Sequence, residues 1–266
     1  MTGARTARLG EHIQSLWSGY GEVRRVVVDD GSSVMVKHVR PPAEAHPRKL
    51  RSYRVEAAWY EGFAARCGDG CRVPRCYGTW FGGDECLFVL EDLTASGMKP
   101  RKMGLSGADT ERCLSWLARF HGTFLHVPPE GLWQTGTYWH LATRPDELAR
   151  MRNRRLREAA PGLDAQLREA RFQTLVHGDA KAANFCLSDD EVAAVDFQYV
   201  GGGPGIRDVA YLLEGFGWLR GRRDRLLDHY FRELRRVRDE PALEGEWRAL
   251  YPVAVQDFER FMDGWR

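Results

Sequence analysis

The first 95 residues alternate apolar and polar positions in short runs that turn residues separate. Three of these runs are typical of strands joined by tight turns: 12–17, 22–28 and 33–39. Apolar residues then recur at helical spacing over 47–66, and two further strand-like runs follow at 72–81 and 84–92. The pattern predicts a small antiparallel sheet and one helix in the order β-β-β-α-β-β.

After about residue 95 the pattern becomes mainly helical. Apolar residues recur at helical spacing in six segments: 106–126, 145–160, 162–171, 207–220, 223–238 and 246–262. The exception is 172–199, where two short apolar runs interrupted by polar residues predict a buried hairpin. A small β lobe (1–95) before a larger helical lobe (96–266) is an α+β plan in two lobes.

Composition and charge exclude several classes of protein. The 266 residues include 39 Lys and Arg against 37 Asp and Glu, a formal net charge of +2, whereas a dedicated nucleic-acid binder needs a strong positive excess. No apolar run approaches the roughly 18 residues of a membrane span, and residues 1–14 lack the apolar core of a signal peptide. We therefore expect a cytoplasmic protein with no nucleic-acid and no membrane partner.

The cysteines raise the question of a zinc site. Four of the six fall within 20 residues, at positions 67, 71, 76 and 86. They lack the paired C-x2-C spacing that places two thiolates on one metal. We expect small buried thiols in a reducing compartment, and six scattered cysteines do not predict a disulfide framework.

Lysine is scarce in this chain. Arginine outnumbers it 34 to 5, which is typical of codon bias in a GC-rich genome. Where Arg is the usual cation, a Lys is mildly informative, because a planar guanidinium cannot always replace a compact ammonium group.

The strongest chemical signal is the segment His177-Gly-Asp-Ala-Lys-Ala-Ala-Asn184, followed twelve residues later by Asp196-Phe-Gln198. Each of two apolar strands ends in an acidic residue, so the predicted hairpin would present Asp179 and Asp196 side by side, with Asn184 on the loop between them. An Asp and an Asn as oxygen ligands, with a second Asp free to accept a hydroxyl proton, suit phosphoryl transfer from a magnesium nucleotide. For either Asp alone, the alternative is a cap of an ordinary turn.

These motifs resemble the catalytic and metal loops of the kinase-like small-molecule phosphotransferases, which include aminoglycoside and choline kinases. The V-D-F-Q form of the second loop and the V-L-E-D-L at 89–93 are most similar to the ecdysteroid-kinase-like family. The resemblance covers about 15–215. It implies a protein-kinase-like two-lobe fold, with a nucleotide-binding β lobe and a helical lobe that holds the catalytic loop, the metal loop and the acceptor-binding helices.

The resemblance also implies roles for individual residues. Asp179 matches the catalytic base, and Asn184 and Asp196 match the Mg²⁺ ligands. Lys37 matches the third-strand lysine that contacts the nucleotide phosphates, and Glu56 its ion-pair partner, with Glu61 as the competitor for that place. The alternative for Lys37 is a solvated lysine on a strand.

Further positions follow from the same resemblance. The turn containing Gly19 and Gly21 would lie over the phosphates, although it departs from a full G-x-G-x-x-G. Glu91 and Leu93 fall where the backbone between the lobes would bind adenine. Lys181 is placed to neutralise the migrating phosphoryl group, or is a surface lysine.

Two polar residues have structural interpretations beside this site. Asp208 matches an Asp that opens a helix beneath the catalytic loop, and a helix N-cap is its simpler role. His121 lies on an apolar helical face and is expected to be structural.

The acceptor is less well defined. Residues 132–140 are rich in aromatic and polar side chains, which suit either stacking on a substrate or packing between the lobes. The following stretch, 144–157, holds six arginines. A polycationic aminoglycoside would require an acidic insert, so these arginines disfavour it, and the alternative is a solvated basic face.

The prediction is a kinase that uses ATP and Mg²⁺ to phosphorylate a hydroxyl group of a small molecule. The first alternative is a nucleotide-binding pseudokinase or regulatory protein. The second is a metal-dependent phosphoesterase, which would need His-rich metal loops that this sequence, with eight His, does not show. The sequence leaves the acceptor and the oligomeric state open.

Overall fold

The computed structural model of the chain describes residues 6–101, 104–215 and 221–265. Within these ranges no helix combines the length and the apolar character needed to cross a membrane.

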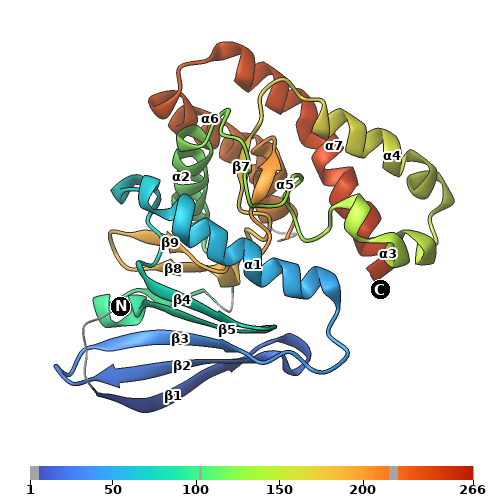
Figure 1. Ribbon diagram of the computed structural model, residues 1–266. Helices are drawn as coiled ribbons and strands as arrows, with labels where there is room; N and C mark the ends of the chain where they lie inside the picture. Colours follow the sequence, from blue (N-terminus) through green and yellow to red (C-terminus); the bar gives the residue numbers. More distant parts are fainter. Residues whose placement is uncertain (1–5, 102–103, 216–220, 266) are drawn as a thin grey trace.

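The N-terminal part is one antiparallel sheet with a helix against it (Figure 1). Its five strands lie in the order β1-β2-β3-β5-β4: β1 (Ala7–Ser15), β2 (Gly21–Val28), β3 (Ser33–Val39), β4 (Cys76–Gly82) and β5 (Glu85–Glu91). The three predicted N-terminal runs are confirmed as strands, but the first begins at Ala7, and the chain makes a short 3₁₀ turn at Trp17–Gly19.

Helix α1 (Pro47–Gly62) joins the sheet to the rest of the molecule. Pro47 occupies its first turn and His46 Nδ1 accepts a hydrogen bond from the backbone N–H of Arg48, which together define its start. The ring of Trp59 stacks on that of Phe197, with 4.5 Å between the ring centroids, and lies edge-on to that of Phe124, with 5.4 Å between the centroids. A single hydrophobic core therefore continues from the helix into the C-terminal part.

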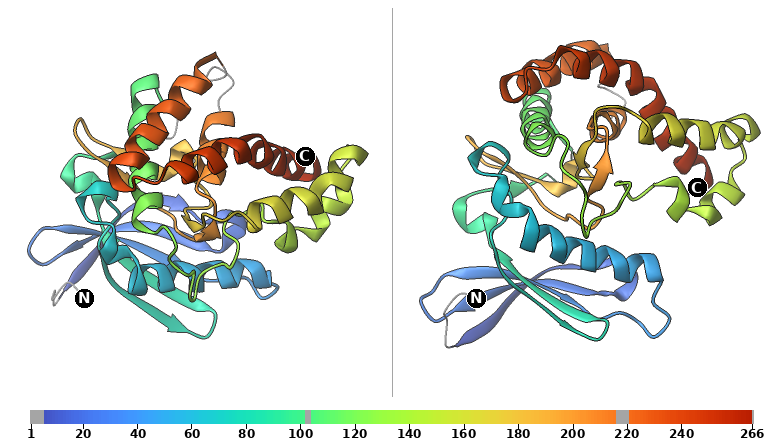
Figure 2. Two further views of the ribbon diagram at one scale, coloured as in Figure 1. Left: turned by 90° about the horizontal axis from the view of Figure 1, so that it is seen from above. Right: turned by 45° about the horizontal axis from the view of Figure 1, so that its top comes forward.

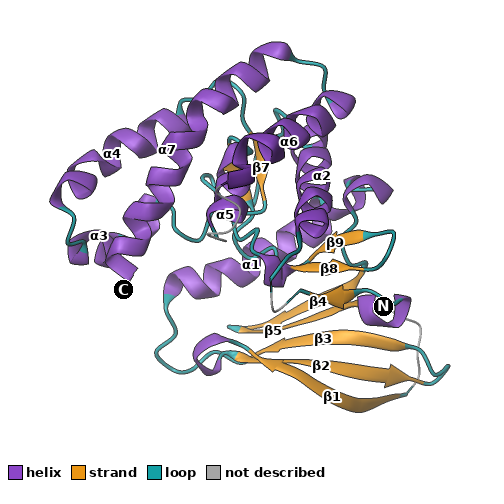
Figure 3. Cartoon of the chain, turned by 180° about the vertical axis from the view of Figure 1, so that it is seen from behind, coloured by secondary structure: helices purple, strands orange, loops and turns teal. Residues whose placement is uncertain are grey.

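The C-terminal part is mainly helical, and Figure 3 shows it lying to one side of the large sheet. Its helices are α2 (Gly107–Thr123), α3 (Pro145–Arg150), α4 (Arg154–Arg168), α5 (Ile206–Glu214), α6 (Arg223–Val237) and α7 (Pro241–Trp265). Helix α7 runs beside α3 and α4 in both views of Figure 2.

The predicted break between the helices at 145–160 and 162–171 is wrong. The chain leaves the helix at 151–153, where Asn153 Oδ1 accepts from the N–H of Leu156 and caps α4, and Pro161 lies inside α4. The cap satisfies a free N–H at the helix start. Of the predicted helix 207–220, residues 216–220 lie outside the described residues.

The predicted hairpin within 172–199 is also wrong. Strand β7 (Thr174–Val176) pairs with β10 (Gly201–Gly203), whereas β9 (Val192–Ala194) pairs with β8 (Phe185–Leu187), which in turn pairs with β6 (Lys99–Pro100). Glycine in β10 permits the close approach of the segment at Trp133, because a Cβ on Gly201 would lie 2.1 Å from the carbonyl oxygen of Trp133. The two acidic residues therefore follow strands of different small sheets, and the α+β plan itself is confirmed.

Candidate active site

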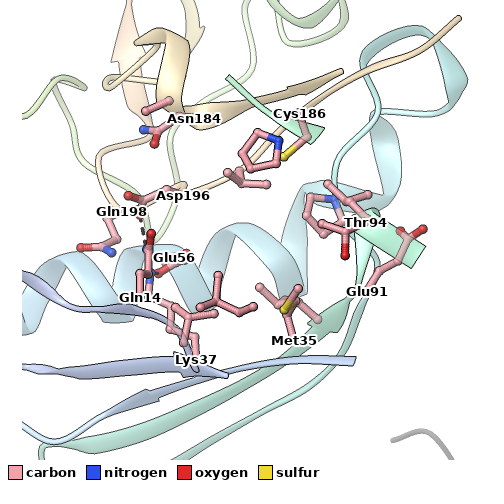
Figure 4. A pocket seen from close by; sticks show the side chains of 18 of the residues that line it. Gln14, Met35, Lys37, Glu56, Glu91, Thr94, Asn184, Cys186, Asp196 and Gln198 are labelled. Carbon is pink, nitrogen blue, oxygen red and sulfur yellow. Dashed lines mark hydrogen bonds and ion pairs between the residues drawn. The ribbon is translucent and has the colours of Figure 1, made fainter. Parts of the chain in front are cut away.

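A cavity of about 210 Å³ lies between the large sheet, α1 and the small sheet that contains β8 (Figure 4). Lys37, Glu56, Asn184 and Asp196 line one end of it, and Figure 4 shows Glu91 and Thr94 at the other. The structure thus gathers residues from β3, α1, β5 and the two motif loops around one space.

Lys37 forms the central ion pair of this cavity. Its Nζ lies 2.6 Å from Glu56 Oε2 and 3.5 Å from Asp196 Oδ1, and Figure 4 shows the three side chains pointing toward one another. Burial opposes the charge on Lys37, but Glu56 and Asp196 outweigh it and raise the Lys37 pKa. Glu61, the competing partner, instead accepts a hydrogen bond from Thr79.

Asp196 is held in an unusual backbone conformation. It follows β9 by two residues and has a φ of 69°, in the left-handed region that non-glycine residues rarely adopt. The backbone strain of such a conformation lowers the stability of the folded protein by about 1–3 kcal/mol, and it is typical of functional sites. Burial would raise the pKa of Asp196, but the charges of Lys37, Lys49 and Lys181 together lower it, so the carboxylate is ionised.

Asp179 lies three residues beyond β7 and is almost fully buried. Its Oδ2 accepts from Lys181 Nζ at 2.6 Å and from Asn184 Nδ2 at 3.0 Å, and its Oδ1 accepts from the Tyr211 hydroxyl at 3.2 Å. Burial raises the pKa of Asp179 above its usual value in spite of Lys181. A buried carboxylate with a raised pKa is suited to accept a proton.

Asn184 connects Asp179 to the cavity. Its Nδ2 donates both to the Asp179 side chain and to the Asp179 carbonyl oxygen, at 2.8 Å, which leaves its Oδ1 as the oxygen available to a ligand. Val195 N donates to the carbonyl oxygen of Asn184 at 2.9 Å, so Asp196 is held beside it. One amide oxygen and one ionised carboxylate on a cavity wall fit the oxygen preference of Mg²⁺.

Asp208 holds the backbone of the segment that precedes Asp179. Its carboxylate accepts from the backbone N–H of His177 at 2.6 Å and of Gly178 at 3.0 Å. The N-cap interpretation of Asp208 is wrong, because Gly205 occupies that position and Asp208 lies inside α5. His121, fully buried, contacts Asp208 through Nε2 at 3.2 Å and the Tyr230 hydroxyl through Nδ1 at 2.8 Å, as a structural residue would.

Among the described residues that line the cavity are Leu16 and Val23, which lie on either side of the first turn, but not the turn's Gly19 and Gly21. Gly21 has a φ of 132°, and a Cβ there would lie 2.0 Å from the carbonyl oxygen of His38, so the approach of β2 to β3 requires glycine. Gly19, with a φ of 74°, has open space around it.

Glu91 and Leu93 both line the far end of the cavity. The Glu91 carboxylate accepts from Arg72 at 2.7 Å and from the N–H of Arg75 at 3.1 Å, so it is turned toward neighbouring protein groups. Leu93 is buried.

The aromatic segment 132–140 is hydrogen-bonded through its backbone to the two motif loops. Thr137 N donates to the Tyr199 carbonyl and Tyr138 N to the Gly178 carbonyl. Trp133 and Trp139 are buried, which favours packing for these two rings, while Tyr138 is half-buried. In the basic stretch Arg144 is buried against Glu147, whereas Arg154 is exposed.

Sequence reasoning missed two residues of this region, Tyr211 and Lys49. Tyr211 lies three residues after Asp208 on α5, and Lys49 lies seven residues before Glu56 on α1. Helical spacing from an assigned residue is the signal that points to each of them.

The family model of the phosphotransferase enzyme family matches residues 12–245. No curated protein matches the chain.

Solved structures with this fold include a kinase and two phosphotransferases. Amicoumacin kinase hAmiN, in complex with AMP-PNP, Ca²⁺ and Ami, has a TM-score of 0.62 at 16% identity, covering 95% of this chain and 79% of that one. Macrolide 2'-phosphotransferase MphH from Brachybacterium faecium has a TM-score of 0.58 at 15% identity, with coverages of 95% and 82%. Aminoglycoside-3'-phosphotransferase of type VIII has a TM-score of 0.51 at 19% identity, with coverages of 95% and 94%.

At these identities the solved structures show the fold alone, and they confirm the predicted kinase-like two-lobe plan. The family match is stronger evidence, because it extends over most of the sequence and includes both the cavity and the motif loops. The chain therefore belongs to the phosphotransferase enzyme family.

Proposed function

We propose that the protein is an ATP- and Mg²⁺-dependent kinase that transfers the γ-phosphoryl group to a hydroxyl of a small molecule in the cytoplasm. The proposal rests on one observation: the ion-paired cluster around Lys37 and the hydrogen-bonded pair of Asp179 and Asn184 lie at the same end of the cavity. Lys37, Glu56 and Asp196 meet in the cavity, and Asn184 on its wall is hydrogen-bonded to Asp179. Phosphoryl transfer depends mainly on such positioning and on electrostatic stabilisation.

Asp179 would orient the acceptor hydroxyl and take its proton. Oδ1 faces Tyr211 and Oδ2 is held by Lys181 and Asn184, so the carboxylate has one orientation before the acceptor arrives. Mg²⁺ bound by Asn184 and Asp196 would offset the charge of the phosphates. Lys37, held by Glu56, would bind the phosphates near the nucleoside.

The remaining assignments stay part of the proposal. Glu91 and Leu93 would meet the adenine at the far end of the cavity, and the turn with Gly19 and Gly21 would approach the phosphates when nucleotide binds. The three similar solved structures are named as an amicoumacin kinase, a macrolide 2'-phosphotransferase and an aminoglycoside-3'-phosphotransferase, which supports a small-molecule acceptor. The V-D-F-Q and V-L-E-D-L motifs support a closer relation to ecdysteroid-kinase-like enzymes.

Substitution of the base tests the proposal. The wild-type protein is screened against a library of hydroxyl compounds for ATP consumption, and the phosphorylated product is identified by mass. Asp179→Asn removes the proton acceptor and is expected to lower turnover by about 10²–10⁴-fold, with binding of Mg-ATP retained.

The exposed Asp190→Asn is the matched control and should keep full turnover. Full activity of Asp179→Asn would contradict the assignment. Release of phosphate from monoesters without ATP would instead support the phosphoesterase alternative.

A further inference from the structure

Lys49 is a lysine near the candidate site that the proposed mechanism does not use. It lies in the first turn of α1, and its Nζ donates to Gln198 Oε1 at 2.7 Å. Ser52 Oγ donates to the same oxygen at 3.1 Å. Gln198 lines the cavity two residues after Asp196, so α1 presents an ammonium group to the metal loop.

The position of Lys49 follows from the helical repeat of α1. Lys49, Tyr53, Glu56 and Tyr60 recur at three- and four-residue spacing, so they share one face of the helix. Glu56 on this face holds Lys37, and Tyr60 contacts the Phe197 ring at 6.2 Å. Lys49 is seven residues from Glu56, about 10 Å along the helix axis. It therefore extends the same row toward the N-terminal end of α1.

The three lysines of this region differ in their partners. Lys37 is paired with Glu56 and Lys181 with Asp179, each at 2.6 Å. Among the described residues no carboxylate oxygen lies within 4.0 Å of Lys49 Nζ, whose hydrogen-bond partner is a neutral amide. Lys49 can thus bind an anion without the loss of an ion pair, whereas Lys181 would have to leave Asp179.

Burial and the start of the helix both oppose the charge of Lys49. Helix N-termini carry a partial positive charge, yet the first turn of α1 holds Arg48 and Lys49 and no acidic residue. Burial lowers the pKa of Lys49 to about 8, although Asp196, Glu56 and Asp179 act to raise it. Cations together with a helix N-terminus form an anion-binding arrangement.

We propose that Lys49 is a second phosphate-binding residue, which contacts the terminal phosphate of the nucleotide while Lys37 contacts the phosphates nearer the nucleoside. This inference rests on the proposed kinase function. It identifies the N-terminal end of α1, where Lys49 meets Gln198 two residues after Asp196, as the place of the transferred group.

Nucleotide affinity tests the inference without an identified acceptor. Dissociation constants for ATP and ADP are measured by calorimetry with Mg²⁺ for the wild-type chain and for Lys49→Met. A hydrogen bond to a charged group is worth about 1.5–3 kcal/mol, so ATP should bind about 10- to 100-fold more weakly to the variant. ADP, which lacks the terminal phosphate, should bind as to the wild type.

Two further variants complete the design. Lys49→Arg keeps a cation and should recover part of the ATP affinity. Lys99→Met removes an exposed lysine on β6 and should change neither constant.

An ATP affinity equal to that of the wild type in Lys49→Met would overturn the inference, as would an equal loss for ATP and ADP. A defect that appears only in the affinity for the acceptor would overturn it too and would assign Lys49 to the acceptor. Absence of Mg-ATP binding by the wild-type chain would refute the proposed function itself, and this inference with it.

Discussion

The identity of the cation matters at Lys37. Its Nζ lies between Glu56 and Asp196, at 2.6 and 3.5 Å, and the ring centroids of Tyr53 and Phe88 are 5.5 and 5.8 Å away. Three of the five lysines, Lys37, Lys49 and Lys181, meet in this region, while the 34 arginines supply most other cations. Lys99 is exposed elsewhere, and Lys102 lies outside the described residues.

Lys37→Arg tests whether a compact ammonium is required there. A guanidinium keeps the charge, but it is wider and planar and does not fit between two carboxylates and two rings without displacing one of them. We expect an unchanged fold by circular dichroism and ATP turnover lowered about 10²-fold, the size of effect that displacement by 1 Å produces.

Lys99→Arg is the control for the lysine-to-arginine exchange and should be silent. An unchanged rate in Lys37→Arg would show that the lysine at this position reflects codon bias alone.

At the scale of elements, α5 holds the segment that contains Asp179 in place. Asp208 lies in its first turn and binds two consecutive backbone N–H groups just after β7, while its neighbour on the next turn, Tyr211, reaches Asp179. Gly178, with a φ of 79°, permits this turn, since a Cβ there would lie 2.1 Å from the Tyr199 carbonyl oxygen. Two side chains of α5 thus hold both the backbone and the carboxylate of the segment 177–179.

Asp208→Ala is expected to affect stability and activity together. It leaves the buried N–H groups of His177 and Gly178 without an acceptor, at a cost of about 1–3 kcal/mol for each group. Urea unfolding should show a lower free energy of unfolding, and turnover should fall because the backbone just before Asp179 loses its acceptors.

Asp208→Asn retains one acceptor oxygen and should lose less stability than Asp208→Ala. An unfolding free energy of Asp208→Ala equal to that of the wild type would refute the supporting role.

At the scale of the whole molecule, a buried ion cluster joins distant segments. Asp257 of α7 lies 2.8 Å from Arg207 of α5 and 2.9 Å from Arg260, and it accepts from Trp139 Nε1 at 3.0 Å. All four side chains are almost completely buried. The cluster therefore links the C-terminal helix to the aromatic segment and to the helix that supports the catalytic loop.

Asp257→Ala leaves two buried guanidinium groups without their counter-charge. Loss of one partner of a buried ion pair costs about 3–5 kcal/mol, so we expect a large decrease in the free energy of unfolding in urea. The exposed pair of Arg154 and Glu158 provides the comparison, since Glu158→Ala should change stability by less than about 1 kcal/mol. Equal effects of the two substitutions would contradict this account.

Local patterns in the sequence predicted the order of the strands and the helix along the N-terminal part, most of the helices beyond it, and both motif loops. These features depend on side-chain periodicity and on spacing along the chain, which are properties of short segments. The tertiary structure decided the pairing of β7 with β10, the hydrogen bonds from the backbone of His177 and Gly178 to Asp208, and the approach of Tyr211 and Lys49 to the site. Those contacts join residues up to 149 positions apart. They form because burial and close packing, rather than spacing along the chain, bring such residues together.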